Sequence, residues 1–446
     1  MPSEEQKRIG EHPADAHGRI LAGPGTGKST TVLSLAARVR GENKAIRVIT
    51  FTRAATAELV AKIKDEKHEV VEPTTVHAFA LSVLMRNPGR TPLPEPLRVP
   101  DEWETATLIH KDLAARLRRD RFQKTLPAHV RKLETEMASE WESLDPNERL
   151  LADLDPALRN RYLALWSAHR RLYGYSLFAE MPLYAKNLIE DAADVNIGAL
   201  DLLVVDEFQD LNRCEIALME ALAKRGIRVV AVGDDDQSIY SMRMAHPIGI
   251  QEFPQRFDGT HDYSLSVSFR CGKAILDVAK ALIESAPNRP ARTAVRPSDD
   301  NPPGTFRYLR FYDQDDERRG VGALVAHFVK RGVKPSKIVV MLRADFNSTW
   351  SNPLRAAIEA HGIAVTDVEA ALEPLSTKSA RNLLAIARLA ESRQDDLAWW
   401  TLLWGTNGIS DEFLTTLADY CMAKDERFSA IVTKLDDLDL PNVSKQ

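Results

Sequence analysis

Residues 19–30 read RILAGPGTGKST, and this stretch decides the fold class of the first part of the chain. RILA is a short apolar run, a Gly-rich segment follows it, and residues 28–40 have the composition of a helix. Three further apolar runs, at 46–51, 201–206 and 227–233, have the length of buried strands and end at polar residues. Short buried strands that alternate with helices predict an α/β fold built on a parallel sheet. Functional residues of such a sheet lie at the carboxyl ends of its strands.

The Gly-rich segment after the first strand carries a phosphate-binding pattern. Residues 22–29, AGPGTGKS, match the Walker A pattern G-x-x-x-x-G-K-[ST] except that Ala22 fills its first position. Glycines let the backbone curl so that its N–H groups face a phosphate, and the start of a helix adds a positive dipole end. We expect Lys28 to reach the β- and γ-phosphates of ATP and the Ser29 hydroxyl to ligate Mg²⁺. The loop residues expected to hold the nucleotide are Ala22, Gly23, Pro24, Gly25, Thr26, Gly27, Lys28, Ser29 and Thr30.

The end of a second strand supports this site. Residues 203–210 read LVVDEFQD, an apolar run that ends in Asp206 and Glu207. In the Walker B arrangement, an aspartate holds Mg²⁺ and a glutamate positions and deprotonates the attacking water. We therefore expect Asp206 to be a metal ligand together with Ser29, and Glu207 to be the general base.

Composition sets limits on the class of protein. The chain has 446 residues and a net charge of -5, so it has no global basic field, and any nucleic-acid surface must be local. Its three cysteines lie far apart and form no CxxC or Cys/His cluster, which predicts a reducing compartment without structural zinc. The polar N-terminus does not resemble a signal peptide, and no apolar run approaches the ~20 residues of a membrane span. We expect a cytoplasmic protein.

The string DEFQD at 206–210 resembles motif II of the superfamily 1 DNA helicases of the UvrD/Rep/PcrA type. Further strings follow in the order of that family and cover nearly the whole chain. They are SEEQ (3–6), TFTRAATA (50–57), TVHAF (75–79), GDDDQSIYSMRMA (233–245), SFR (268–270) and VVMLR (339–343). The combination is specific to this family.

The resemblance implies ATP held between two RecA-like motor domains, each with a largely helical insertion. It implies that Gln6 reads the adenine and that Gln237 senses the γ-phosphate and couples it to the DNA site. Arg270 would be an arginine finger that stabilises charge on the transferring phosphoryl group. Phe269 stands where the family has a tyrosine stacked on adenine, and it keeps the aromatic ring. The catalytic residues expected are Lys28, Asp206, Glu207, Gln237 and Arg270.

For DNA, the resemblance implies a single strand held by stacking on aromatic rings and by local phosphate contacts. Met242 replaces a tryptophan that wedges against bases in the family, and Met244 replaces a glycine. Both departures weaken stacking, because Met offers a base less contact area. The residues expected at the DNA are Phe51, Thr52, Arg53, His77, Met242 and Arg243. The expected partners are single-stranded DNA or a duplex–single-strand junction, together with a partner protein.

The expected domains follow from the interruption of the strand–helix pattern by charged helical sequence and from its return after residue 300. They are a first RecA-like ATPase domain (1–86 and 179–270), a helical insertion (87–178), a partial second RecA-like domain (271–375) and the start of a second helical insertion (376–446). In the partial domain we expect strands at 306–312, 337–342 and 363–367 and helices at 316–332 and 352–361.

Two family strings, T-x-H-x-x-K-G-L-E and V-A-x-T-R-A, do not occur after Arg270. The second supplies another arginine to the γ-phosphate, and an arginine finger contributes ~10³–10⁵ in rate. We therefore expect a chain truncated before these motifs, a fragment or a natural short form, that binds ATP and hydrolyses it weakly.

Two functions stay open at this point. One is an ATP-dependent DNA helicase or translocase, 3′-to-5′ by resemblance, in repair or related DNA metabolism. The other is an ATP- and DNA-binding interaction module of a multi-protein assembly with weak or no ATPase of its own. A kinase or signalling GTPase would not explain DEFQD, GDDDQSIY and SFR in this order.

Overall fold

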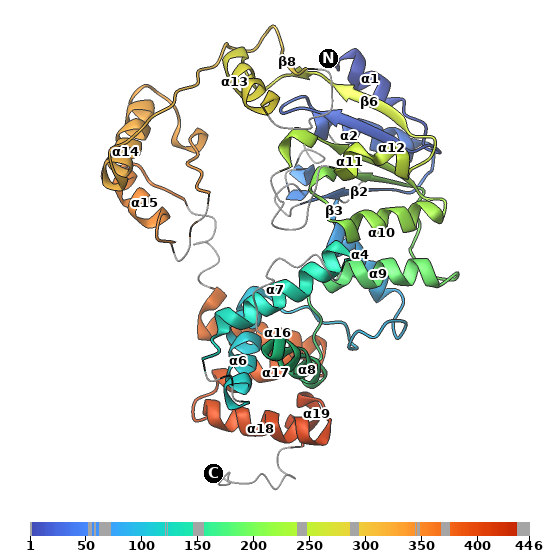
Figure 1. The fold of residues 1–446 in the computed structure, drawn as a ribbon, viewed down its shortest axis with the longest axis vertical. Helices are drawn as coiled ribbons and strands as arrows, with labels where there is room; N and C mark the ends of the chain where they lie inside the picture. The colour runs from blue at the N-terminus through green and yellow to red at the C-terminus, as the bar shows by residue number, and fades with distance from the viewer. Residues whose placement is uncertain are drawn as a thin grey trace. The chain divides into compact units, whose positions relative to one another are not determined.

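The chain divides into two units, shown as a ribbon in Figure 1. One unit comprises Met1–Gly304 and Arg381–Gln446, and the other comprises Thr305–Ala380. The computed structural model describes residues 2–51, 56–57, 59–61, 73–120, 122, 124–145, 156–238, 248–285, 294–343, 345, 348–366 and 375–434. No helix among these residues is both long and apolar enough to cross a bilayer.

A six-stranded parallel sheet forms the centre of the first unit, in the order β3-β2-β4-β5-β1-β6. The strands are β1 (Gly18–Ala22), β2 (Ile46–Thr50), β3 (Thr74–Thr75), β4 (Leu202–Val205), β5 (Arg228–Gly233) and β6 (His261–Leu265). The four predicted strands are confirmed as β1, β2, β4 and β5. All four residues of β4 are buried, because helices cover both faces of a parallel sheet and the strand is apolar throughout.

Helices cover both faces of this sheet. On one face, α1 and α2 pack against alternate residues such as Val48, Val204 and Val230, and on the other face α4, α9 and α10 pack against Ile49, Val205 and Ala231. The helices around the sheet, including four short ones that follow its strands, are α1 (Glu4–Gly10), α2 (Lys28–Gly41), α4 (Val76–Met85), α9 (Glu180–Asp191), η2 (Phe208–Asp210), α10 (Arg213–Lys224), η3 (Asp235–Gln237), α11 (Ile248–Gln251) and α12 (Phe253–Arg256). The predicted helix at 28–40 is confirmed as α2.

A helical body in the same unit is built from two separate stretches of sequence. Its elements are α5 (Glu102–Glu104), η1 (Thr105–Ile109), α6 (His110–Arg119), α7 (Pro127–Ser143), α8 (Pro156–Tyr173), α16 (Lys378–Glu391), α17 (Asp396–Gly405), α18 (Asp411–Lys424) and α19 (Phe428–Val432). Tyr162, Leu417 and Phe428 are fully or almost fully buried in one common core. The rings of Tyr173 and Phe428 lie 5.5 Å apart, so α8 and α19 pack together across a long separation in sequence.

The chain between the sheet and the second unit starts with β7 (Val267–Ser268), α13 (Lys273–Glu284) and β8 (Arg296–Pro297). Strands β7 and β8 pair in parallel as a separate two-stranded sheet. The position of β7 matters for the site, because it is followed at once by Phe269 and Arg270.

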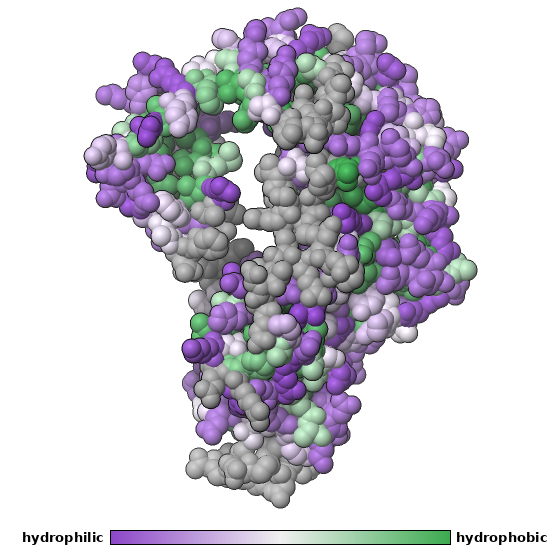
Figure 2. All heavy atoms as spheres, viewed as in Figure 1, coloured by the Kyte–Doolittle hydropathy of each residue, from purple (hydrophilic) through white to green (hydrophobic). Residues whose placement is uncertain are grey.

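The second unit contains α14 (Gln314–Lys330), η5 (Pro335–Lys337) and α15 (Ser351–Glu359). The predicted helices are confirmed, and α14 packs closely on α15: a Cβ at Gly322 would lie 2.6 Å from the carbonyl oxygen of Ala357. The predicted strands are wrong, since none of the described residues within 306–312, 337–342 and 363–367 belongs to a strand. A strand requires a hydrogen-bonded neighbour. Tyr308, Val339 and Met341 are instead 83%, 78% and 87% exposed, and apolar surface of this unit is visible in Figure 2.

Candidate active site

The loop from Ala22 to Lys28 joins β1 to α2 and has a shape that only glycines permit. Gly25 and Gly27 have φ values of 71° and 84°, a region in which residues with a Cβ are strained. A Cβ at Gly23 would lie 2.3 Å from a methyl of Val295, and a Cβ at Gly25 would lie 2.4 Å from Cβ of Arg270. The loop is therefore a tight turn that brings backbone N–H groups to the start of α2, which is the arrangement that a phosphate requires.

Residues predicted to bind the nucleotide surround this loop. The Gln6 side chain donates from Nε2 to the carbonyl of Thr26 at 3.2 Å and accepts at Oε1 from the N–H of Ser3 at 2.9 Å. The Phe269 N–H donates to the carbonyl of Gly25 at 2.8 Å. The Phe269 ring is 48% exposed, so α1 and the segment after β7 both reach the loop and leave an aromatic face open there.

Ser268 and Arg270 complete this contact. Ser268 Oγ donates to the carbonyl of Pro24 at 2.8 Å, and Arg270 places its Cβ over Gly25. Arg270 itself is exposed. The SFR string thus lies directly against the Gly-rich loop, and the arginine-finger role of Arg270 stays a prediction.

Two residues that were predicted to be catalytic meet where β4 ends. Lys28 Nζ lies 3.1 Å from Oε2 of Glu207, and their side chains are 13% and 33% exposed. Glu207 has φ 54° and ψ 43°, a left-handed conformation that costs a non-Gly residue about 1–2 kcal/mol. Such strain is concentrated at functional sites, and here it accompanies a carboxylate that faces Lys28 directly after a buried strand.

Asp206 and Ser29 offer the donors that Mg²⁺ prefers. Asp206 is 9% exposed and accepts at Oδ1 from the N–H of Glu207 at 3.0 Å. Ser29 is the second residue of α2 and partly buried. A carboxylate and a hydroxyl are hard oxygen ligands, so the chemistry of this pair fits a magnesium ion bound with phosphate oxygens.

A buried acid beside Glu207 was not predicted from the sequence. Asp210 is 6% exposed, and within the described part of the chain its Oδ1 has no hydrogen-bond partner. Burial and the charge of Glu207 raise the pKa of Asp210 to about 7. Its presence in the DEFQD string was the only signal in the sequence.

Gln237 lies in η3, directly after β5. Its N–H donates to the carbonyl of Asp234 at 2.9 Å, and its side-chain amide donates to the carboxylate of Asp234. Asp234 is fully buried, whereas Gln237 is exposed. Gln237, the predicted phosphate sensor, is thus held by hydrogen bonds at the end of β5 and remains exposed at the surface.

Among the residues predicted for DNA, His77 has a defined aromatic partner. Its ring stacks on Phe178 with a centroid distance of 4.0 Å and an interplanar angle of 2°, and its Nδ1 lies 3.5 Å from Oε1 of Glu215. Phe178 is 49% exposed, so one stacked pair presents an aromatic ring to solvent. The sequence did not indicate Phe178, because nothing local shows that it meets His77.

Phe51 directly follows β2 and is partly buried, at the same carboxyl edge of the sheet as the phosphate-binding loop. The other four DNA predictions, Thr52, Arg53, Met242 and Arg243, lie outside the described residues.

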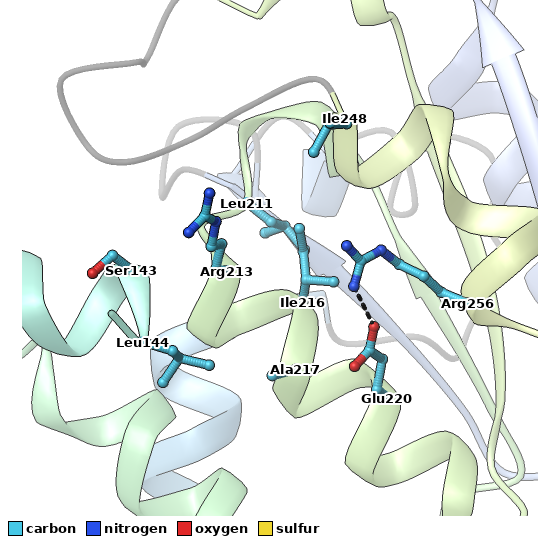
Figure 3. A pocket seen from close by; sticks show the side chains of 9 residues that line it. All are labelled: Ser143, Leu144, Leu211, Arg213, Ile216, Ala217, Glu220, Ile248 and Arg256. Atoms are coloured by element: carbon cyan, nitrogen blue, oxygen red, sulfur yellow. Dashed lines mark hydrogen bonds and ion pairs between the residues drawn. The ribbon is translucent and has the colours of Figure 1, made fainter. Parts of the chain in front are cut away.

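A separate pocket of about 320 Å³ lies between the end of α7, α10 and α12 (Figure 3). Arg256 and Glu220 form an ion pair of 2.8 Å on one side of it, and Leu144 and Ile248 contribute apolar walls. None of the described residues predicted for the nucleotide or for DNA is among those that line this pocket.

Comparison with known proteins agrees with this geometry. Residues 3–258 match the family described as the UvrD/REP helicase N-terminal domain. The chain is 23% identical to the putative ATP-dependent DNA helicase YjcD of Bacillus subtilis (strain 168), over 94% of this chain and 56% of that protein. It is 26% identical to DNA helicase II of Haemophilus influenzae, over 89% of this chain and 55% of that protein.

A third relative, the ATP-dependent DNA helicase Rep of Escherichia coli (strain K12), is 25% identical over 60% of this chain and 41% of its own length. The chain thus spans about half the length of the curated relatives that it matches. The matched segment contains the phosphate-binding loop, the Lys28–Glu207 pair and Gln237. With more than half of its residues matched by the family and these side chains in place, the chain belongs to the UvrD/REP helicase N-terminal domain family.

Proposed function

We propose that the chain is the ATP-hydrolysing part of a DNA helicase or translocase that moves on single-stranded DNA. The observation that carries the proposal is the contact between Lys28 and Glu207 beside a glycine loop that the SFR segment also touches. A lysine for the phosphates, a carboxylate base and an arginine in one place are what phosphoryl transfer to water requires.

Each residue has a definite task in this proposal. The loop N–H groups and Lys28 bind the phosphates, Glu207 takes the proton of the attacking water, and Arg270 stabilises charge on the transferring group. Mg²⁺, held by Ser29 and Asp206, would neutralise phosphate charge when bound. Gln6 and Phe269 would bind the adenine, and Gln237 would report the γ-phosphate to the DNA site.

DNA would bind at the carboxyl edge of the sheet, near Phe51 and the stacked pair His77–Phe178. An aromatic ring open on one face can stack on any base, which suits sequence-independent binding of a single strand. Relatives named as DNA helicases support this choice of partner. The 3′-to-5′ direction, a role in DNA repair and a cytoplasmic location belong to the proposal through the family resemblance.

The proposed domains keep the boundaries given above. The sheet with its helices is the first RecA-like domain, and 271–375 is part of a second. The two helical stretches, 87–178 and 376–446, are the insertions of these two domains. The two stretches share one hydrophobic core in this structure.

The test is steady-state ATP hydrolysis with and without single-stranded DNA, by the parent chain and by Glu207→Gln. We expect slow turnover by the parent, below ~10 s⁻¹, the usual median for enzymes, because only one arginine finger is assigned. Glu207→Gln should abolish turnover and retain nucleotide binding, since Lys28 and the loop are unchanged. Turnover by the variant at the parent rate would show that Glu207 is not the base. Binding of ATP and DNA without turnover by the parent would favour the interaction module instead.

A further inference from the structure

Gln209 is a buried residue between the general base and the end of β5, and none of the roles above uses it. It is 1% exposed and lies in η2. Its Nε2 donates to Oε2 of Glu207 at 2.9 Å, and its Oε1 accepts from the N–H of Asp234 at 3.0 Å. The amide of Gln209 therefore joins Glu207, which follows β4, to Asp234, which follows β5.

The surroundings of Gln209 leave the amide little freedom. A Cβ at Gly233 would lie 2.2 Å from its Oε1, so β5 passes the amide at a distance that only glycine permits. Ser238 Oγ donates to the backbone carbonyl of Gln209 at 3.2 Å. Gln209 thus contacts both the first and the last residue of the turn Asp234–Ser238. This turn carries Gln237.

The hydrogen bond from Gln209 to Glu207 can hold the general base during the proposed reaction. Oε2 of Glu207 accepts both from Lys28 at 3.1 Å and from Gln209 at 2.9 Å. A phosphate would attract the Lys28 ammonium, whereas the neutral amide has no charge to be drawn away. Hydrogen bonds to an ionised carboxylate are about twice as strong as neutral ones, so Gln209 can hold the base once Lys28 turns to the phosphates.

We propose that Gln209 is a positioning residue that ties the Glu207 carboxylate to the Asp234–Ser238 turn, so that the turn sets the place of the general base. The inference rests on the proposed function, in which Glu207 is the base and Gln237 the phosphate sensor. In the sequence this turn is followed by residues 239–247, which lie outside the described residues and include Met242 and Arg243, two of the six residues predicted to touch DNA. Because the turn carries Gln237, Gln209 would link the position of the proposed phosphate sensor to that of the base.

The variant that tests this is Gln209→Met, which keeps the length of the side chain and removes its donor and its acceptor. We expect kcat for ATP to fall on the order of 10- to 100-fold, as for loss of one hydrogen bond to a charged group. The dissociation constant of a fluorescent ATP analogue should change less than twofold, because the loop and Lys28 are untouched. Stimulation of hydrolysis by single-stranded DNA should be lost.

Gln251→Met is the matched control. Its Nε2 donates to Oδ2 of Asp235 at 3.1 Å, on the same turn but away from Glu207. This control removes the same amide group from a contact with the same turn, and it should keep kcat and DNA stimulation within twofold of the parent. Equal losses in the two variants, or an unchanged kcat in Gln209→Met, would overturn the proposal.

A double-mutant cycle with Glu207→Gln separates this inference from the proposed function. Because Glu207→Gln leaves no turnover to compare, the cycle is evaluated from urea unfolding midpoints. If the parent itself does not hydrolyse ATP, the proposed function fails, whereas the unfolding cycle still tests the inference. Residues in direct contact give non-additive shifts, so purely additive shifts at 207 and 209 would overturn the inference.

Discussion

Gly25 provides the sharpest test of how the phosphate-binding loop is shaped, through the change Gly25→Ala. Its φ of 71° would cost an alanine about 1–2 kcal/mol. The added Cβ would also lie 2.4 Å from Cβ of Arg270 and 2.9 Å from Oγ of Ser268. Carbon atoms attract best at about 3.5–4.0 Å, so the overlap exceeds about 1 Å, and Cβ of Arg270 is too close to the backbone to rotate away.

The segment 268–270 must therefore move off the loop. Two hydrogen bonds of 2.8 Å would break, from Ser268 Oγ to Pro24 and from the Phe269 N–H to Gly25. At about 0.5–1.5 kcal/mol each, they add about 1–3 kcal/mol to the strain. We expect nucleotide affinity to fall at least about tenfold, since 1.4 kcal/mol corresponds to a factor of ten. The assay is titration with a fluorescent ATP analogue, with circular dichroism to confirm that the variant folds.

Gly226→Ala is the control for backbone strain alone. Gly226 has φ 86°, and a Cβ there would meet nothing within 4 Å. This variant should lose stability by a similar strain but retain nucleotide affinity within twofold. Equal nucleotide affinities for the two variants would refute the claim that contact with 268–270 shapes the loop.

Two further predictions concern Asp210 and Phe178. The pKa of Asp210 is raised from 3.8 to about 7, so its protonated form favours folding below about pH 4, and this contribution is lost as the pH rises through 7. Asp210→Asn stays neutral at every pH. The urea unfolding midpoint of this variant should therefore rise relative to that of the parent between pH 4 and 7, and the difference should stay constant above pH 7. A difference in midpoint that does not depend on pH would contradict this prediction. Phe178→Ala should weaken binding of a labelled single-stranded oligonucleotide about 5- to 150-fold, as expected for loss of ~1–3 kcal/mol of base stacking, whereas Phe178→Trp should retain it. Unchanged anisotropy titrations for Phe178→Ala would remove the stacked pair from the DNA site.

The meeting of Lys28 and Glu207 in the candidate site could be predicted from the sequence because both residues follow apolar strands. Ala22 ends β1 and Val205 ends β4, so Lys28 and Glu207 had to meet at one edge of a parallel sheet once both strands were recognised. The assignment of Phe269 and Arg270 to the nucleotide came from the family resemblance, since no local pattern connects residue 269 with Gly25.

The contacts of Gln209 and Phe178 could not be predicted in the same way. Each depends on the direction of one side chain toward a residue distant in sequence, Asp234 in the first case and His77 in the second. The strands expected at 306–312 and 337–342 failed for a related reason. An apolar run has the composition of a strand, but whether a neighbouring strand bonds to it is a property of the fold.

The shared core of the helical body has a consequence for synthesis of the chain. The Tyr173 ring packs on Phe428, so α8 leaves the ribosome about 250 residues before its partner α19. At ~5–20 residues per second, that delay is roughly 10–50 s, long compared with the folding of a helix bundle. Throughout that interval the apolar face of α8, with Tyr162 and Trp166, is without part of its native cover. We expect nascent chains stalled between α8 and α19 to bind a chaperone through this face, and release to follow translation of Phe428.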